Sequence, residues 1–364
     1  MKRAAAALAL AAFLPALLAA AAPGKAAVPA AVVVPDVDPL RLTPKMAQFL
    51  VKEVGGRQGR ALRLNALINA IFSKDGLDIT YGETATRTAI ETFKERDGNC
   101  LSFTFLFVAM ARHLGFSAYF TEVDEVLSWD QRGEILVVHK HMFATVEMDN
   151  GTVRVDFLPG AEKRYRDIRR ISDSRAVAHY YNNLGADLLT AGDAAGALPY
   201  LDKALERDRS LTLALVNRGV AYRQLGDFAA AEECYRQALE VDKGEASAAS
   251  NLASLYLSQG RVEEAQPLLR RVHNHLKRNP FHYFRQGVLA AERGHSEAAI
   301  KHLRQAIDRM PGESGFHAAL ADAYLQAGDL EEARKSLRRA LRAAKGAQQR
   351  SQMEARLAGL PEPQ

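Results

Sequence analysis

The chain has 364 residues, of which 48% are hydrophobic and 25% charged, and its formal net charge is +5. This composition excludes wholesale intrinsic disorder and fits two or three folded units of roughly 100–200 residues each. Acidic and basic residues are interspersed along the C-terminal part, which is typical of a solvated protein surface rather than of a nucleic-acid-binding stripe. We therefore expect no nucleic acid among the partners.

Residues 1–22 combine a basic start at Lys2 and Arg3 with an apolar stretch of small residues, a pattern typical of a secretory signal peptide. The alternative is an uncleaved membrane anchor, but the stretch is rich in alanine, contains Pro15 and is only weakly hydrophobic. We expect cleavage, a periplasmic or secreted protein, and no stable membrane span afterwards. Residues 23–40, rich in Ala, Val and Pro, are expected to form an extended, mobile linker.

Residues 41–160 begin with patterns that predict helices. One helix is expected after Thr43, which can cap it, and a second around Leu64 to Ile71, where apolar residues recur at helical spacing. A third is expected from Thr84 to Lys94. The continuous apolar stretch from Cys100 predicts a fourth helix, ended by a glycine at position 115.

Strand signals follow these helices. Residues 116–123 alternate like a strand, Trp129 to Gly133 is expected to be a turn, and residues 134–148 predict a long strand. The Asp149-Asn150-Gly151 sequence is a strong hairpin signal, and residues 152–157 predict the returning strand. Helices followed by an antiparallel sheet indicate an α+β domain.

Residues 161–177 are expected to be a basic connector between this domain and the rest of the chain. We expect a solvated helix or loop, and the alternative is a site for an acidic partner. The basic residues of the connector are Lys163, Arg164, Arg166, Arg169 and Arg170.

Residues 178–347 repeat every 34 positions. One set of glycines keeps this spacing at Gly192, Gly226, Gly260, Gly294 and Gly328, and a second set of small residues keeps it at Gly185, Gly219, Ala253, Gly287 and Ala321. In this register the chain resembles the tetratricopeptide repeat (TPR) family. The resemblance implies five units stacked as an all-α TPR solenoid that binds a protein or peptide through its concave face. Residues 348–364 are expected to form a capping helix and tail.

The chain has two cysteines, Cys100 and Cys234, and we expect no disulfide because they fall in different predicted units. Asn99 can cap the helix that begins at Cys100, where the positive end of the helix dipole favours a thiolate. The alternative is that Cys100 is a small buried hydrophobic residue. Cys234 lies in the second TPR unit and is expected to be a packing residue.

His141 and Asp156 are expected on adjacent strands of the hairpin around Asn150. The imidazole and the carboxylate would then lie side by side, as a cysteine nucleophile requires. The alternative is that His141 lies on the sheet surface and Asp156 merely ends a strand. His139 is a rival for the base, but a His139/His141 metal pair lacks a third ligand, so neither a metal nor a cofactor is predicted.

The Arg-x-Gly-x-Cys segment from Arg96 to Cys100, followed by His141 and Asp156, resembles the transglutaminase-like superfamily, in the bacterial secreted branch that is joined to TPR units. The resemblance covers roughly residues 60–160 and implies a papain/transglutaminase-like α+β fold. It also implies that Cys100 is the nucleophile, His141 the general base and Asp156 the residue that orients it.

The function implied by these resemblances is that of a secreted thiol enzyme with a TPR protein-binding module. Such an enzyme would hydrolyse amide bonds, or transfer their acyl groups, through an acyl-enzyme at Cys100. The alternative is a non-catalytic TPR scaffold or interaction protein of the bacterial envelope that carries a relic thiol fold.

Overall fold

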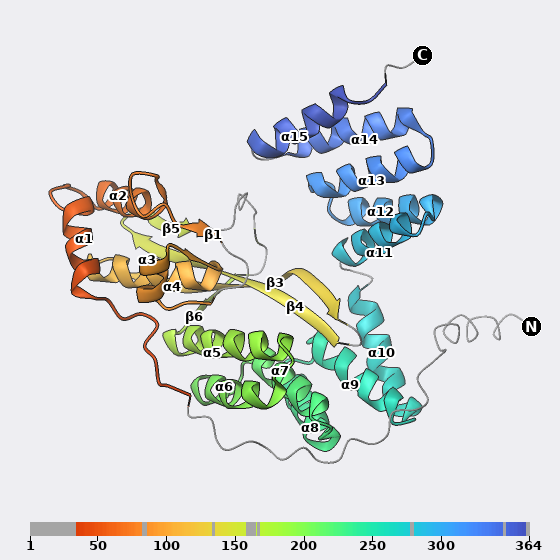
Figure 1. Cartoon of the computed structure of the whole chain (residues 1–364), viewed down its shortest axis with the longest axis horizontal. Coiled ribbons are helices and arrows are strands. Elements are labelled where there is room, and N and C mark those ends of the chain that lie inside the picture. The colour runs from red at the N-terminus through yellow and green to blue at the C-terminus, as the bar shows by residue number, and fades with distance from the viewer. Residues whose placement is uncertain are drawn as a thin grey trace, which may run out of the picture.

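The computed structural model of the chain describes residues 34–81, 86–132, 135–157, 165, 168–276, 280–344 and 347–361. These residues form fifteen helices and six strands (Figure 1). The expected signal peptide, residues 1–22, lies outside the described residues. Among the helices that are described, none has both the length and the apolar character needed to cross a membrane.

The first described residues, 34–40, pack against the repeat array instead of forming the mobile linker that we expected. The backbone N–H of Val37 donates to the Tyr181 hydroxyl at 2.9 Å, and this hydroxyl donates to the carbonyl of Pro35 at 3.1 Å. A buried tyrosine hydroxyl needs such partners, and composition alone does not reveal that a distant segment supplies them. The rest of the expected linker, residues 23–33, lies outside the described residues.

Three helices and two short strands lead to the central helix. Thr43 caps the first of them by accepting the backbone N–H of Met46 at 3.3 Å. The third helix begins at Ala89 rather than Thr84, because Thr88 and Glu91 form a capping box at that point. The bounds of these elements are α1 Pro44–Val54, α2 Arg60–Phe72, β1 Thr80–Tyr81, α3 Ala89–Glu95 and β2 Asp97–Gly98, with β1 and β2 parallel.

The central helix is α4, Cys100–His113, and its residues from Leu101 to Ala111 are all buried. A helix that is apolar on every side must be covered on every side, so α4 forms the middle of the α+β part. Its N-cap is Asn99, whose Oδ1 accepts the backbone N–H of Ser102 at 3.1 Å. It ends, as predicted, before Gly115, which has a φ of +82°.

A four-stranded antiparallel sheet follows, in the order β5-β4-β3-β6. The turn that we expected from Trp129 is wrong, because β3 continues to Arg132 and Trp129 lies opposite Val138 on β4. Strand pairing depends on backbone hydrogen bonds, so the polar residues after Trp129 do not end the strand. The hairpin around Asn150 is confirmed. The strands are β3 Ala118–Arg132, β4 Ile135–Met148, β5 Gly151–Val155 and β6 Ile168–Ile171.

Beyond Val123, β3 and β4 leave the sheet as a two-stranded ribbon, because β6 pairs with β3 only as far as that residue. The ribbon runs over the repeat array, and β4 contacts α9, Ala246–Ser258 (Figure 1). An isolated two-stranded ribbon is marginally stable, so this contact with the array supports it.

The expected basic connector contains β6 and the first residues of α5 instead of a solvated helix or loop. Arg169 forms an ion pair with the buried Glu122 at 2.9 Å, and Arg170 forms one with Glu147 at 3.0 Å. These two arginines are therefore engaged in ion pairs within the chain. The other basic residues of the connector lie outside the described residues.

The predicted 34-residue repeat is confirmed as five helix pairs. The five glycines that end the first helix of each pair all have φ between +75° and +85°, a conformation that favours glycine. The helices are α5 Asp173–Thr190, α6 Ala194–Arg207, α7 Thr212–Gln224, α8 Phe228–Val241, α9 Ala246–Ser258, α10 Val262–Leu276, α11 Pro280–Glu292, α12 Ser296–Arg309, α13 Ser314–Gln326 and α14 Leu330–Ala343, and α15 Ala347–Ala358 packs on α14.

The second set of small residues allows the two helices of a pair to approach closely. A Cβ atom on Gly219 would lie 2.5 Å from the ring of Tyr235, and one on Gly287 would lie 2.5 Å from Leu303. Both distances are too short for real carbon atoms, so the spacing reflects a packing requirement of each pair.

One hydrophobic core crosses the boundary that we placed at residue 178. Phe105 of α4 packs against Phe120 of β3 with ring centroids 5.4 Å apart, and against Tyr180 of α5 with centroids 6.2 Å apart. The same cluster of buried residues extends to Ala214 on α7. Helix α5, which opens the first TPR unit, begins at Asp173 and is thus packed directly on the α+β part.

Candidate functional site

His141 and Asp156 are joined by a short hydrogen bond inside the sheet. The Nε2 atom of His141 lies 2.8 Å from Oδ1 of Asp156, and the two side chains are only 4% and 7% exposed. The last pair of the β4–β5 ladder joins Ala144 to Val155. Asp156 therefore lies two positions before the residue that would face His141, and diagonal neighbours of this kind share a face of the sheet.

Cys100 is the first residue of α4 and has a free, half-buried thiol. The Cys100 thiol lies close enough to the His141 imidazole to raise the pKa of that ring. Because Nε2 of the imidazole is engaged with Asp156, the other ring nitrogen, Nδ1, is the one available to the thiol. The structure thus brings together all three residues that the sequence singled out.

The imidazole of His141 is strongly basic. Burial lowers its pKa, but the hydrogen bonds to Asp156 and to Cys100 outweigh burial and raise the pKa to about 9. At neutral pH the protonated ring is therefore stabilised between a carboxylate and a thiol, and proton exchange between Cys100 and His141 is favoured by their contact.

Sequence reasoning missed a fourth member of this group, Tyr165. Its hydroxyl donates to Oδ2 of Asp156 at 2.8 Å, so both carboxylate oxygens accept hydrogen bonds. Burial and the neighbouring Asp156 raise the pKa of Tyr165, which keeps the hydroxyl protonated as a donor. The only signal in the sequence is one aromatic residue within a basic segment, and that signal does not identify its partner.

An aromatic wall supports the same side of the site. The Tyr165 ring stacks on Phe143 with centroids 5.7 Å apart, and the Arg154 guanidinium lies 4.7 Å from the centroid of Phe143 and 5.5 Å from that of Tyr165. These contacts fix the Tyr165 ring and therefore the position of the hydroxyl that holds Asp156.

The backbone before Cys100 is positioned by its own contacts. The left-handed residue of this segment is Arg96, with a φ of +58°, whereas Gly98 is buried in β2 and has no left-handed φ. Asn99, besides capping α4, donates from Nδ2 to the hydroxyl of Thr86 at 2.6 Å. Thr86 also accepts from Asn183 of α5 at 3.3 Å, which links the first TPR unit to the N-cap of α4.

Two other residues are candidates in the sequence, His139 as a base and Cys234 as a second thiol. His139 lies opposite Ser128 on the ribbon, where side chains are outside the described part of the structure. Cys234 of α8 is 3% exposed, and burial raises the pKa of its thiol, as fits a packing residue. Within the described ranges, no group of three or more His, Cys, Asp or Glu side chains is arranged to bind a metal.

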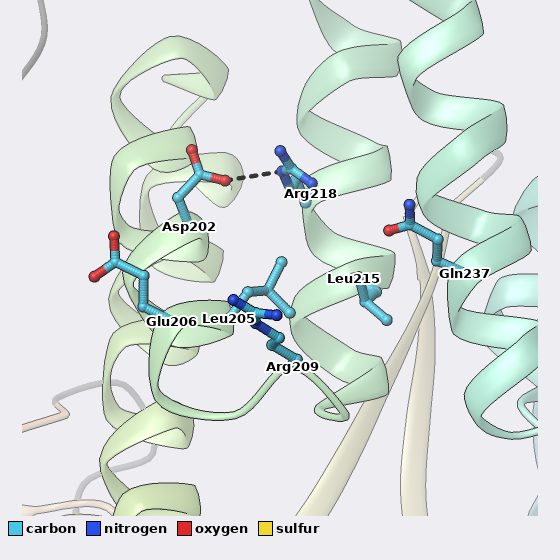
Figure 2. Close-up of a pocket in the computed structure, with 7 residues that line it drawn as sticks. All are labelled: Asp202, Leu205, Glu206, Arg209, Leu215, Arg218 and Gln237. Atoms are coloured by element: carbon cyan, nitrogen blue, oxygen red, sulfur yellow. Dashed lines mark ion pairs between the residues drawn. The ribbon is translucent and has the colours of Figure 1, made fainter.

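A separate cavity of about 370 Å³ lies in the repeat array (Figure 2). It opens between α6, α7 and α8 and has Leu205 and Leu215 among its lining residues. Asp202 and Arg218 face one another across it in an ion pair of 2.9 Å, shown by the dashed line in Figure 2. The residues that line the cavity include both acidic and basic side chains and none of the residues of the Cys100 site. The cavity therefore does not favour one class of ligand over another.

Two family models, both described as tetratricopeptide repeat, match the chain. One matches residues 181–244 and 210–278, and the other matches residues 290–357. Neither match includes the α+β part. The transglutaminase-like resemblance of that part therefore stays a prediction.

The chain is similar to several curated proteins over part of its length. It is 28% identical to Superkiller protein 3 of Schizosaccharomyces pombe, over 38% of this chain and 10% of that protein. It is 27% identical to Superkiller complex protein 3 of Mus musculus, over 47% of this chain and 12% of that protein. The chain thus spans about a tenth of the length of these relatives. It is 36% identical to an uncharacterized protein of Methanocaldococcus jannaschii over 18% of this chain and 77% of that protein.

Similar solved structures include YrrB, which is described as a TPR protein with an unusual peptide-binding site. YrrB is 20% identical to this chain, and the alignment covers 49% of this chain and 92% of the YrrB chain with a TM-score of 0.27. The pilF protein of Pseudomonas aeruginosa is 21% identical and covers 51% of this chain and 85% of its own, with a TM-score of 0.29. The family models thus identify residues 181–278 and 290–357 of this chain as tetratricopeptide repeats.

Proposed function

We propose that the chain is an exported interaction protein of the bacterial envelope, whose TPR array holds a protein or peptide partner. The observation that carries this proposal is the stack of five helix pairs in one register, since such stacks present extended concave surfaces to proteins. The proposal favours the scaffold alternative over the enzyme as the primary role, because the family matches lie in the array.

The test is site-specific photo-crosslinking in the periplasm of a bacterial host. A benzoylphenylalanine is placed at the exposed Gln326 on α13, a first helix, or at the exposed Arg338 on α14, a second helix. Discrete protein adducts are expected from Gln326 and not from Arg338. The same adducts from both positions, or none from either, would contradict binding by the first helices of the array.

We propose thiol chemistry at Cys100 as a second function, which the His141–Asp156 hydrogen bond specifically favours. In this scheme the protonated His141 already holds on Nδ1 the proton that Sγ has given up, in keeping with the raised pKa of the imidazole, and the thiolate attacks an amide carbonyl. The imidazolium then returns the proton to the leaving amine, which leaves a thioester on Cys100. Because Cys100 is half-buried rather than sealed, we favour water as the second nucleophile, which gives amide hydrolysis.

The test of the thiol chemistry is covalent capture by a peptide acyloxymethyl ketone, read by intact mass and peptide mapping. One adduct on Cys100 is expected, absent in Cys100→Ser and at least tenfold slower in His141→Ala. Circular dichroism provides the folding control. If His141→Ala reacts as fast as the unaltered chain, the imidazole is not the base.

A further inference from the structure

The helix that carries Cys100 is contacted at several points by the first TPR unit. At the C-terminal end of α4, Arg112 forms an ion pair with Asp173 of α5, with Nη2 of the arginine 2.8 Å from Oδ1 of the aspartate. Near the middle of α4 is the contact between the rings of Phe105 and Tyr180. Helix α5 therefore begins beside the end of α4 and runs back towards Cys100.

A third contact lies at the N-terminal end of α4 and consists of two side-chain amides and one hydroxyl. The hydroxyl of Thr86 accepts from Nδ2 of Asn99 at 2.6 Å and from Nδ2 of Asn183 at 3.3 Å. Asn183 lies on α5, and Asn99 is the residue that immediately precedes Cys100. One hydroxyl thus joins the first TPR unit to the start of the helix that carries the thiol.

Thr86 determines which way the amide of Asn99 points. An asparagine caps a helix only when its oxygen faces the N-terminus, and Oδ1 of Asn99 accepts the backbone N–H of Ser102 at 3.1 Å. Asn99 is 9% exposed, so Nδ2 on the other side of the amide requires a protein acceptor, which Thr86 provides. Loss of this acceptor would leave a buried donor unsatisfied and loosen the first turn of α4.

The second TPR unit offers a direct comparison with Asn183. Asn217 of α7 occupies the same repeat position and is also half-buried. Its Nδ2 donates to Oδ1 of Asn182 at 2.9 Å, so this bond lies within the array, whereas Asn183 donates to Thr86 of the α+β part. Asn182 reaches Asn183 only through a long contact of 3.4 Å, so a change at Asn217 should have little effect on Thr86.

We propose that the first TPR unit is a component of the thiol site, with Asn183 as its positioning residue. Through the hydroxyl of Thr86, Asn183 fixes the amide of Asn99, and this amide fixes the first turn of α4. That turn holds Cys100 beside His141. The inference rests on the proposed thiol chemistry and adds to it a residue outside the α+β part.

The test is the rate at which limiting iodoacetamide alkylates Cys100 in the full chain at pH 7, measured by peptide mapping. Thr86→Val keeps the shape of the side chain but removes the acceptor, and it should slow alkylation about tenfold. Asn183→Leu removes one of the two donors to Thr86 and should slow it about fivefold. Thr86→Ser retains the hydroxyl and should stay within about twofold of the unaltered chain.

The matched control is Asn217→Leu, which makes the same change at the same repeat position and should alter the rate less than about twofold. Circular dichroism checks folding, and so does Cys234 in the same digest, because this thiol is 3% exposed and becomes reactive only if the array opens. If Asn183→Leu unfolds, Asn183→Ala replaces it.

Two results would overturn the proposal. In one, Asn183→Leu and Asn217→Leu react at the same rate, whether both are slowed or neither is. In the other, Thr86→Ser is slowed as much as Thr86→Val, which would mean that the hydroxyl is not what matters.

The ketone probe separates this inference from the chemistry on which it rests. If the ketone fails to capture Cys100 while iodoacetamide still ranks the variants as expected, the amide chemistry is contradicted and the positioning role of Asn183 is supported.

Discussion

At the scale of single residues, His141 couples the stability of the α+β part to pH. The pKa of this side chain is raised from 6.5 to about 9 in the folded chain, so the folded state holds the proton more tightly than the unfolded state. The stabilisation is fully present below pH 6.5 and is lost as the pH rises through 9. Its size is up to about 3 kcal/mol in the free energy of unfolding.

Urea denaturation of the full chain near pH 6 and near pH 10 measures this effect. The free energy of unfolding should fall with rising pH in the unaltered chain and much less in His141→Gln, which cannot bind the proton. Equal pH dependence in the two proteins would mean that another group is responsible.

The two thiols should differ in reactivity. Cys100 is half-buried, at a helix N-terminus and beside His141, whereas Cys234 is buried with a raised pKa. Limiting iodoacetamide at pH 7 should label Cys100 at least tenfold faster, as measured by peptide mapping. Preferential labelling of Cys234 would exclude Cys100 as the nucleophile.

The two partners of the imidazole should contribute unequally. Asp156→Asn removes the carboxylate that orients the ring and should slow capture of Cys100 by the ketone probe about 100-fold or more. Tyr165→Phe removes one hydrogen bond to Asp156 and should slow it about tenfold or less. His139→Ala is the control and should react normally, whereas a loss confined to His139→Ala would mean that the register along β4 has been misassigned.

The core of the site was predictable because its determinants are local. The hairpin around Asn150 fixes the offset between His141 and Asp156, and Asn99 begins the helix that carries Cys100. Tyr165 was not predictable, because its contact with Asp156 depends on how the chain returns after β5. That path is set by tertiary packing and leaves no periodic signal in the sequence.

At the scale of helices and strands, the repeat was the most predictable feature and the strands the least. The 34-residue spacing identifies every helix pair because each glycine has the same role in each unit. Three features depend on partners far along the chain: the length of β3, the strand β6 and the docking of residues 34–40. A local sequence pattern does not reveal such partners. For this reason the end of β3 was predicted as a turn, β6 as part of a connector and residues 34–40 as part of a linker.

The small residue at which the two helices of a pair meet should not tolerate a larger side chain. Gly219→Ala places a Cβ 2.5 Å from the Tyr235 ring, so overpacking should lower the free energy of unfolding by about 1–3 kcal/mol. Gly312→Ala is the control, because nothing lies within 4 Å of its added Cβ and its φ is not left-handed. Urea denaturation should find Gly312→Ala within about 0.5 kcal/mol of the unaltered chain. Equal losses in both variants would contradict the packing argument.

At the scale of the whole molecule, we expect the array to divide into two cooperative blocks. Solenoids unfold as coupled neighbours, and among the described residues the apolar cluster that reaches Ala265 on α10 is separate from the one that includes Phe284 on α11. We expect two transitions in scanning calorimetry. Leu201→Ala should lower one melting temperature and Leu303→Ala the other, since these fully buried residues lie in different clusters.

A single transition that moves with either variant would contradict this division. The two substitutions are matched, because Leu201 lies against Gly185 in the first unit as Leu303 lies against Gly287 in the fourth. Their different effects would then come from position in the array and not from the chemistry of the change.

The core shared by α4, β3 and α5 also bears on how such a chain can change during evolution. Repeat arrays gain and lose whole units, and a unit is replaceable when it contacts only other units. The first unit contacts the α+β part through Tyr180, and its Tyr181 holds the segment from Pro35 to Val37. Duplication or deletion of that unit would expose the core of the α+β part, so changes in repeat number should be confined to α11 and the helices that follow it.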